Sequence, residues 1–159
     1  MAAKHKKEPE RFREVRNSKA GRNFFIGETF EAGIKLTGTE VKSIRAGKAQ
    51  INDAFVRIDS GDVPTLYHAH ILEYAFGNRE NHNPTRPRVL LLHKKEIDKI
   101  KHEMEAGGQA LIPLKLYFKC GLVKVAIALC KGKKLFDKRE DMKKKDEMRE
   151  AERAMNRRR

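Results

Sequence analysis

The residues LKLYFKCGLVKVAIALC, at positions 114–130, form the clearest strand pattern in the chain. Apolar residues from Leu114 to Phe118 alternate with lysines and a tyrosine, and after a turn at residues 120–121 the alternation resumes from Val123. A period of two places every second side chain on the same face of a strand. The stretch therefore predicts an antiparallel hairpin with one apolar face.

Further strand patterns lie on the N-terminal side of this hairpin, at residues 22–26, 28–36, 51–59, 67–72 and 88–93. Thr37 and Glu40 have the spacing of a helix-capping box, which predicts a short helix over residues 37–47. A second helix is predicted over residues 94–106, because Ile97, Ile100 and Met104 share one helix face. About six short strands without a repeated βαβ rhythm favour a mainly β fold, namely a closed or partly open antiparallel barrel of the oligonucleotide-binding-fold type.

The net charge of +14 on 159 residues is concentrated at the two ends of the chain. We expect a flexible basic arm over residues 1–16, a barrel domain over residues 17–130 and a basic tail over residues 131–159. The tail holds 13 Lys or Arg and 7 Asp or Glu, with too few apolar residues to build a core. Its residues are mostly good helix formers. We therefore predict a tail that is disordered when free and helical on an acidic partner such as RNA.

Several classes of protein are disfavoured by what the sequence contains. Two cysteines ten residues apart suit a reducing compartment, and the chain has no apolar stretch long enough for a membrane span and no signal-peptide pattern, so we expect a cytoplasmic protein. Phosphate-binding-loop, HExxH and nucleophile–histidine patterns are missing from the sequence. We expect no enzymatic activity, no cofactor and no metal.

Two surfaces have side chains suited to RNA. Lys115, Tyr117 and Lys119 should share one strand face, with Lys124 on the partner strand, so that phosphates and a base could be held together. The loop at residues 77–88 is rich in the amide, imidazole and guanidinium groups that RNA loops bind, in Asn78, Arg79, Asn81, His82, Asn83, Arg86 and Arg88. Ordinary solvent-exposed faces with the same composition are the alternative.

His68 and His70 form an HxH pattern on one predicted strand face. With His82 as a third ligand, these residues could hold a metal in a nuclease. Strand histidines with this spacing are more often structural or surface groups, so the nuclease is the weaker alternative.

Three long stretches, at residues 33–49, 77–97 and 112–140, resemble the small protein B family, the SsrA-binding proteins. The resemblance implies an oligonucleotide-binding-fold barrel that binds the tRNA-like domain of transfer-messenger RNA. It also implies delivery of this RNA to stalled bacterial ribosomes for trans-translation, with the nascent chain tagged for proteolysis. The tail would occupy the decoding centre and the empty message channel, and elongation factor Tu would be a further partner through the charged RNA.

The family's RNA-binding positions match Glu31, Leu91 and Lys124, and we extend this expectation to Arg45, Asn78, Arg79, His82, Arg86 and Lys119. The family's ribosome-engaging tail motif matches Asp137, Lys138 and Arg139, preceded by Lys131, Gly132, Lys133 and Lys134, and we include Phe136, just before Asp137, among the candidate tail residues. Two positions depart from the family pattern. Phe136 replaces the usual Tyr or His, and Ser18 replaces a basic residue after Asn17.

A general single-stranded RNA-binding or RNA-chaperone module of the same fold remains the main alternative. Such a module would bind many RNAs with similar affinity, and loss of its tail would weaken all of them alike.

Overall fold

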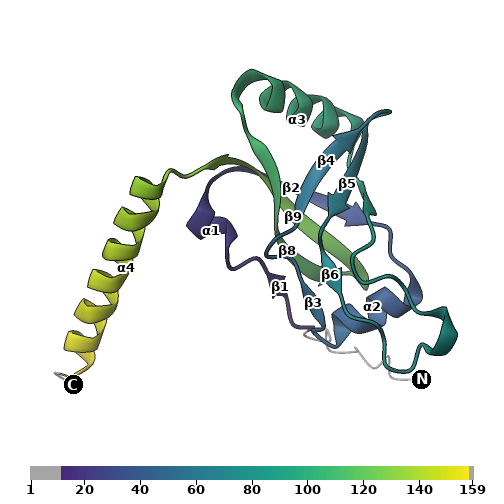
Figure 1. The fold of residues 1–159 in the computed structure, drawn as a ribbon, viewed down its shortest axis with the longest axis horizontal. Coiled ribbons are helices and arrows are strands. Elements are labelled where there is room, and N and C mark those ends of the chain that lie inside the picture. Colours follow the sequence, from purple (N-terminus) through teal and green to yellow (C-terminus); the bar gives the residue numbers. More distant parts are fainter. Residues whose placement is uncertain (1–11, 158–159) are drawn as a thin grey trace, which may run out of the picture.

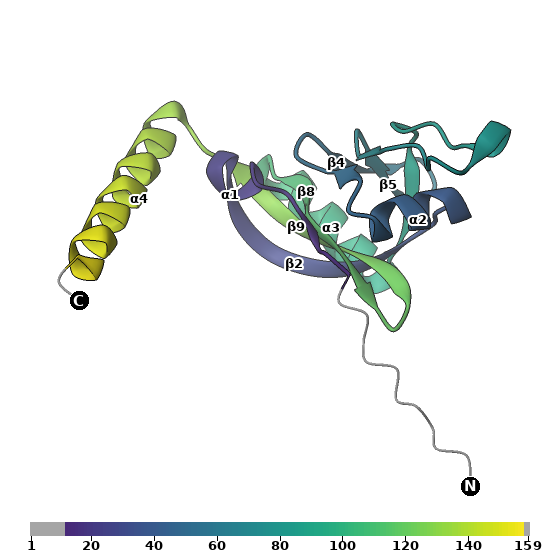
Figure 2. The same cartoon turned by 90° about the horizontal axis from the view of Figure 1, so that it is seen from below.

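In the computed structural model, which describes residues 12–157, a β-barrel carries a long C-terminal helix that projects away from it (Figure 1 and Figure 2). The strands of this part of the chain are β1 (Val15–Arg16), β2 (Phe24–Ile34), β3 (Ala49–Gln50), β4 (Phe55–Asp59), β5 (Val63–Tyr67), β6 (His70–Ile71), β7 (Arg88–Leu91), β8 (Ala110–Lys119) and β9 (Leu122–Gly132). The helices are α1 (Ala20–Asn23), α2 (Gly38–Arg45), the 3-10 helix η1 (Asn78–Glu80), α3 (Lys94–Gly107) and α4 (Leu135–Asn156).

The barrel is a ring of antiparallel strands in the order β8-β4-β5-β7-β2-β9, which returns to β8. Its narrowest junction is between β4 and β8, where Val56 pairs with Leu111. The short β1 pairs with the remainder of the same edge of β8, so this end of the predicted N-terminal arm belongs to the sheet. The rest of the arm predicted over residues 1–16 lies mostly outside the described residues. The predicted mainly β, antiparallel architecture is confirmed.

The hairpin that the sequence predicts is formed by β8 and β9, and they pair over nearly their whole length. Cys120 and Gly121 form its turn with φ values of 52° and 77°. Positive φ at both central residues is the geometry that matches the twist of a two-residue hairpin. Glycine adopts it freely, whereas Cys120 is held in a conformation that few residues other than glycine adopt.

The two strands predicted at residues 22–26 and 28–36 are a single strand, β2. Its register against β9 shifts between Ile26 and Thr29. A Cβ atom at Gly27 would lie 2.7 Å from the carbonyl oxygen of Leu129, so only glycine allows this approach. The prediction of a strand from Arg22 is wrong, because residues 20–23 form α1, which buries Ala20 against the barrel.

Both predicted helices are confirmed. Helix α2 begins at the predicted capping box, in which the backbone N–H of Thr37 donates to Glu40 Oε2 at 2.8 Å. Helix α3 ends at Gly108, whose φ of 59° is the left-handed conformation that commonly terminates helices.

The predicted strand over residues 67–72 is wrong. His68 has a φ of 58°, which interrupts the extended backbone. The segment is therefore divided between β5, in the barrel, and β6, which pairs with β3 in a separate two-stranded sheet. His68 and His70 consequently do not share the face of one strand.

The main core fills the inside of the ring. Its fully buried members come from nearly every element around it and include Ala32, Ile51, Leu66, Ile71, Leu90, Ile100, Val125 and Ile127. Each large apolar side chain buried in this way contributes about 1.5–3 kcal/mol relative to exposure. A smaller cluster outside the ring, Ala20, Ile112, Ala128 and Cys130, attaches α1 to the barrel.

The tail is a continuous 22-residue helix, α4, with no buried residue. The predicted helical conformation of the tail is thus present, and its disorder in the free protein stays a prediction. The composition of the tail favours a helix. The Lys134 N–H donates to Asp137 Oδ2 at 3.1 Å, and this hydrogen bond caps the first turn of α4. Because little tertiary burial supports it, its local stability should be low.

None of the helices in residues 12–157 combines the length and the apolar character needed to cross a membrane.

Candidate nucleic-acid interface

Four predicted RNA-binding residues gather on the outer face of the barrel, over β2, β7, β8 and β9. We call this surface the Glu31 face; its members are Glu31, Leu91, Tyr117, Lys119 and Lys124. The carboxylate of Glu31 lies 2.9 Å from Lys119 Nζ and also accepts a hydrogen bond from the Tyr117 hydroxyl. Strand β9 lies between β2, which carries Glu31, and β8, which carries Tyr117 and Lys119. The β9 residue paired with Glu31 is the small Ala126, which leaves room for the side chains of Glu31, Tyr117 and Lys119 to meet across β9.

The charges of this cluster support one another. Hydrogen bonds from Tyr117 and Lys119 lower the pKa of Glu31 from its ordinary value. Partial burial, together with the hydrogen bond to Glu31, raises the pKa of Tyr117 to about 12. Glu31 is thus a carboxylate at neutral pH, and Tyr117 keeps its proton. The carboxylate fixes the position of Lys119 and still exposes oxygen atoms that could accept from base amino groups or ribose hydroxyls.

Leu91 and Lys124 lie side by side across Gly33, which pairs with both of them. Together with Leu122 they line a shallow groove of about 280 Å³. Leu91 is 51% and Leu122 is 63% exposed, which is high for leucine. The groove therefore combines apolar contact area with one ammonium group, and a ribose or base edge next to a phosphate could occupy it.

Arg45 lies on another side of the barrel, at the end of α2. Its guanidinium carbon is 5.3 Å from the ring centroid of Phe12 and 5.8 Å from that of Phe118. Phe118 points to the opposite face of β8 from Lys119 because adjacent side chains of a strand alternate. Arg45 is therefore held by two aromatic rings and does not belong to the Glu31 face.

The predicted loop residues separate into two groups. Asn78 and Arg79 are exposed at η1, whereas His82 is buried at 7% exposure. Both ring nitrogens of His82 are within hydrogen-bond distance of protein atoms, Nδ1 at 2.9 Å from Thr39 Oγ1 and Nε2 at 3.0 Å from the Ile71 carbonyl oxygen. His82 therefore attaches the loop to α2 and β6, and direct contact of His82 with RNA stays a prediction.

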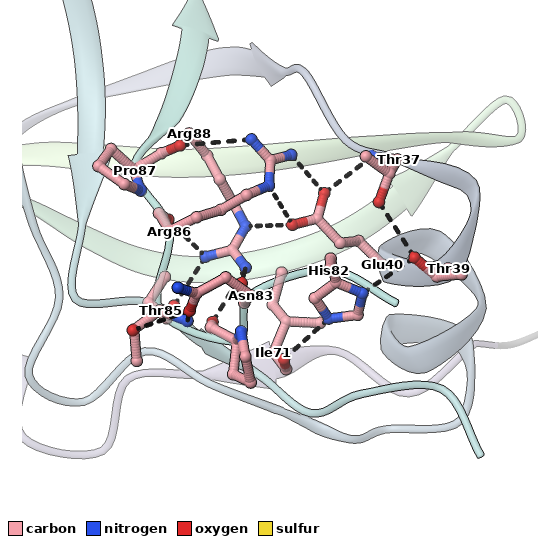
Figure 3. A network of polar contacts seen from close by, with 12 residues as sticks. Thr37, Thr39, Glu40, Ile71, His82, Asn83, Thr85, Arg86, Pro87 and Arg88 are labelled. Atoms are coloured by element: carbon pink, nitrogen blue, oxygen red, sulfur yellow. Dashed lines mark hydrogen bonds and ion pairs between the residues drawn. The ribbon is translucent and has the colours of Figure 1, made fainter. Parts of the chain in front are cut away.

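A buried ion-pair network fixes the base of the same loop (Figure 3). Glu40 and Arg88 are both 0% exposed, and their Oε1 and Nε atoms lie 2.9 Å apart. Arg86 adds a second guanidinium, with Nη2 2.6 Å from Glu40 Oε2. Arg88 also donates to the carbonyl oxygens of Ala69, Arg86 and Pro84. The carboxylate and the guanidinium donors of Arg88 thus have the partners that burial requires.

Burial would by itself raise the pKa of Glu40. The guanidinium of Arg86, the Thr37 amide and Arg88 outweigh this effect, so the pKa lies below its ordinary value. Burial lowers the pKa of Arg88 against the opposing charge of Glu40, but a guanidinium stays protonated at any pH the fold survives. The network is therefore ionised at neutral pH, and it sets the direction in which Arg86 and the loop leave the barrel.

The junction between barrel and tail depends on Lys133, whose side chain is only 9% exposed. Its Nζ atom donates to the Gly21 carbonyl oxygen at 2.9 Å and to Asp141 Oδ2 at 2.5 Å. It also lies 5.0 Å from the centroid of the Phe25 ring. The hydrogen bond from Lys133 lowers the pKa of Asp141. One ammonium group thus joins α1, β2 and α4.

The other predicted tail residues are distributed over β9 and the first turns of α4. Lys131, Gly132, Lys134, Phe136 and Arg139 are exposed, and Asp137 and Lys138 are half-buried. Asp137 already has a structural role as the cap of α4. Engagement of a ribosome by these residues stays a prediction.

Sequence reasoning predicted Glu40 as a helix cap but missed its buried ion pair with Arg88, and it missed the structural role of Lys133. Charged residues are expected at the surface, and no local pattern reveals that a partner lies 48 positions away, as for Glu40 and Arg88. Among residues 12–157, no group of three or more His, Cys, Asp or Glu side chains is arranged to hold a metal.

Comparison with known proteins gives concordant matches. The family model described as "SmpB protein" matches residues 14–157. The SsrA-binding protein of Geobacter sulfurreducens is 58% identical over 139 residues, covering 87% of this chain and 90% of that protein. The SsrA-binding protein of Shouchella clausii is 56% identical over 144 residues, covering 91% and 92%. A solved structure described as "tmRNA-SmpB: a journey to the center of the bacterial ribosome" is 42% identical, with a TM-score of 0.64, and covers 77% of this chain and 85% of that one.

Proposed function

The chain belongs to the SmpB protein family, and from this premise we propose that it is an RNA-binding adaptor for the rescue of stalled ribosomes. Its barrel binds the tRNA-like domain of transfer-messenger RNA. The protein then delivers this RNA to a bacterial ribosome stalled in the cytoplasm, where translation resumes on the RNA's own reading frame. The adaptor itself performs no chemistry, and elongation factor Tu joins through the charged RNA.

The observation that carries this proposal is the convergence of Glu31, Leu91, Lys119 and Lys124 on one face, from four strands. The face offers a fixed ammonium group, a second ammonium beside an apolar groove and a carboxylate acceptor. These groups match a phosphate, a ribose or base edge, and the donors of a base or sugar. The mixture of charge and shape favours a folded RNA over any acidic polymer.

The loop at residues 77–88 supplies a second part of the same recognition. Asn78 and Arg79 are free to contact RNA, and Arg86 is half-exposed while bound to Glu40. Because the buried network holds the base of the loop, binding here has a small ordering cost.

The tail engages the ribosome. Helix α4 has no buried residue and carries the basic residues that a channel of ribosomal RNA would attract. In this proposal Lys131, Lys134, Lys138 and Arg139 contact ribosomal RNA in the decoding centre and message channel. Phe136, which is 68% exposed, stacks on a base. Asp137 starts the helix, and Lys133 sets its direction.

The test compares the two halves of the full chain. Transfer-messenger RNA is titrated at physiological salt with tRNA and random RNA as competitors, and rescue is measured by tagging on a message that lacks a stop codon. Lys124→Ala should weaken RNA binding, whereas Lys95→Ala, which removes one exposed charge of α3, should not. Replacing Asp137, Lys138 and Arg139 by alanine should leave RNA affinity nearly unchanged and abolish rescue.

The matched control for the tail variant is Lys144→Ala, which removes the same net charge from α4. Loss of RNA binding in the tail variant would contradict the division of labour. Equal competition by every RNA would favour the general RNA-binding module instead.

A further inference from the structure

An exposed pair of aromatic rings lies away from the Glu31 face, in the segment between β6 and η1. Phe76 is 82% exposed, the most of any large apolar residue in the described part of the chain. Its ring centroid is 5.6 Å from that of Tyr74 at an interplanar angle of 64°. Figure 2 shows the loop that contains η1, in teal, standing out from the barrel beyond α2. Neither ring belongs to the hydrophobic core, so packing within the chain does not explain their presence.

The backbone that carries the two rings is fixed. Asn81 clamps Tyr74 from both sides, since its Oδ1 accepts from the Tyr74 N–H at 3.0 Å and its Nδ2 donates to the Tyr74 carbonyl oxygen at 2.8 Å. The Gly77 N–H donates to the same carbonyl oxygen at 2.9 Å. A Cβ atom at Gly77 would lie 2.8 Å from the Asn81 side-chain amide, so a larger residue here would displace the side chain that holds Tyr74. The backbone at Tyr74 is therefore fixed before any partner arrives, which lowers the ordering cost of binding.

Positive charge borders the rings on the side of α2. Lys42 Nζ lies 5.2 Å from the centroid of the Tyr74 ring. Lys48 and Arg79 are exposed as well, and within residues 12–157 none of these three cations takes part in an ion pair. Glu73 and Glu80 balance part of this charge within the loop, so the positive excess comes from α2 and the residues just after it.

We propose that Tyr74 and Phe76 form a stacking platform for an unpaired base of the bound RNA, with Lys42 and Arg79 placed for the adjoining phosphates. This inference rests on the proposed RNA-binding function and adds a contact on a different surface from the Glu31 face. An aromatic face stacks on any base, and cations beside it neutralise the backbone. A folded RNA that is held at the Glu31 face and also by an unpaired base here is contacted from two sides of the barrel, which fixes its orientation.

The chain has no tryptophan, so Phe76→Trp introduces a single indole at the platform. In the full-length variant, transfer-messenger RNA should quench the emission of this indole while binding with affinity close to that of the parent chain. Phe76→Ala should weaken binding by about 5- to 150-fold, the range for loss of one stacked base. The loss should vary little with salt, whereas Lys42→Ala should also reduce the salt dependence. Met148→Ala, which removes an exposed apolar side chain of α4, should change none of these values.

Several outcomes would overturn the inference. If the indole emission stays unchanged while RNA binds in a Lys124-dependent manner, the stacking platform is contradicted and the proposed function still holds. Phe76→Ala with unchanged RNA affinity but impaired rescue would assign the rings to the ribosome or a protein partner instead. If the parent chain shows no preference for transfer-messenger RNA over tRNA and random RNA, the proposed function itself is contradicted, whatever the platform variants do.

Discussion

The Nζ atom of Lys133 lies 2.5 Å from Oδ2 of Asp141, one residue at the end of the barrel and the other in the second turn of α4. Because Lys133 is nearly buried and also binds the Gly21 carbonyl oxygen, this contact sets the direction in which the helix leaves the barrel. A basic residue in a tail motif is usually assumed to contact the partner directly. Lys133 contacts its own chain, so loss of function on its substitution would have a different cause from loss at Lys138 or Arg139.

Lys133→Ala should release the start of α4 from α1. We expect faster amide hydrogen exchange over residues 135–142 and little change in the affinity of the barrel for RNA, because the Glu31 face does not include Lys133. Hydrogen exchange with mass spectrometry measures the first quantity. Lys131→Ala, at an exposed neighbouring position, is the control and should leave exchange unchanged. Beyond residue 142, α4 should exchange rapidly in both proteins, and strong protection there would contradict its low local stability.

The Glu40–Arg88 pair should be costly to break from either side. Glu40→Gln or Arg88→Leu leaves a buried group without its charge partner, which typically costs about 3–5 kcal/mol of the free energy of unfolding. Urea denaturation of each variant measures this loss. The double variant should lose less than the sum of the single losses, since no unpaired charge remains within the pair. Additive losses would mean that the two residues do not depend on each other.

Acid should destabilise the fold partly through Glu40. Its pKa in the folded chain lies below the ordinary value of 4.5, so the unfolded chain takes up the proton first as the pH falls. The stabilisation is therefore complete above about pH 4.5 and is lost as the pH falls through the lower folded value. Urea midpoints measured from pH 7 downwards should decrease in the parent chain. In Glu40→Gln they should start lower and vary less, and an identical dependence in both chains would exclude Glu40 as a cause.

Lys124→Ala should reduce the salt dependence of RNA binding. If Lys124 neutralises one phosphate, the slope of log K against log salt should become less steep by about 0.7–0.9. Affinity titrations at several salt concentrations give the slope. Leu91→Ala, in the same groove, is the companion variant and should weaken binding with no change of slope. A smaller slope in both variants would indicate a general loss of contact with the RNA.

Tyr117 should report the integrity of the Glu31 face. Ultraviolet titration should show a tyrosine that ionises near pH 12 in the parent chain, because burial and the hydrogen bond to Glu31 both favour the phenol. In Glu31→Gln the hydrogen bond to a carboxylate is lost, so the pKa of Tyr117 should fall, while burial, the larger cause, keeps it above its ordinary value. Tyr117→Phe identifies the signal. A titration unaffected by Glu31→Gln would show that the two side chains do not interact in solution.

Local patterns were enough to predict the elements whose shape is decided within a few residues. The β8–β9 hairpin has its alternation and turn in one stretch, and α3 has a single apolar face followed by glycine. The strand predicted through His68 was wrong because its alternation continues across this residue, whose φ of 58° interrupts the extended backbone.

Features that depend on residues far apart in the sequence could not be predicted from local patterns. Glu31 and Leu91 were proposed only through resemblance to a family, since nothing in their spacing indicates that β2 and β7 lie next to β9. Lys124 was also proposed from the alternating pattern of the β8–β9 hairpin. Glu40, Arg88 and Lys133 are charged residues in polar stretches, and only the three-dimensional structure shows that they are buried.

Strand β2 has a mechanical consequence. Phe25, whose ring lies next to the ammonium group of Lys133, and Glu31, on the Glu31 face, lie on this one strand, six positions apart. At roughly 3.3 Å per residue they are separated by at most about 20 Å, and pairing with β9 keeps that distance constant. The strand thus sets a fixed spacing between the Glu31 face, which we propose binds the RNA, and the start of the tail. Inserting one residue into it would turn Glu31 to the opposite face, whereas α4 could gain or lose a turn at its far end without disturbing either point.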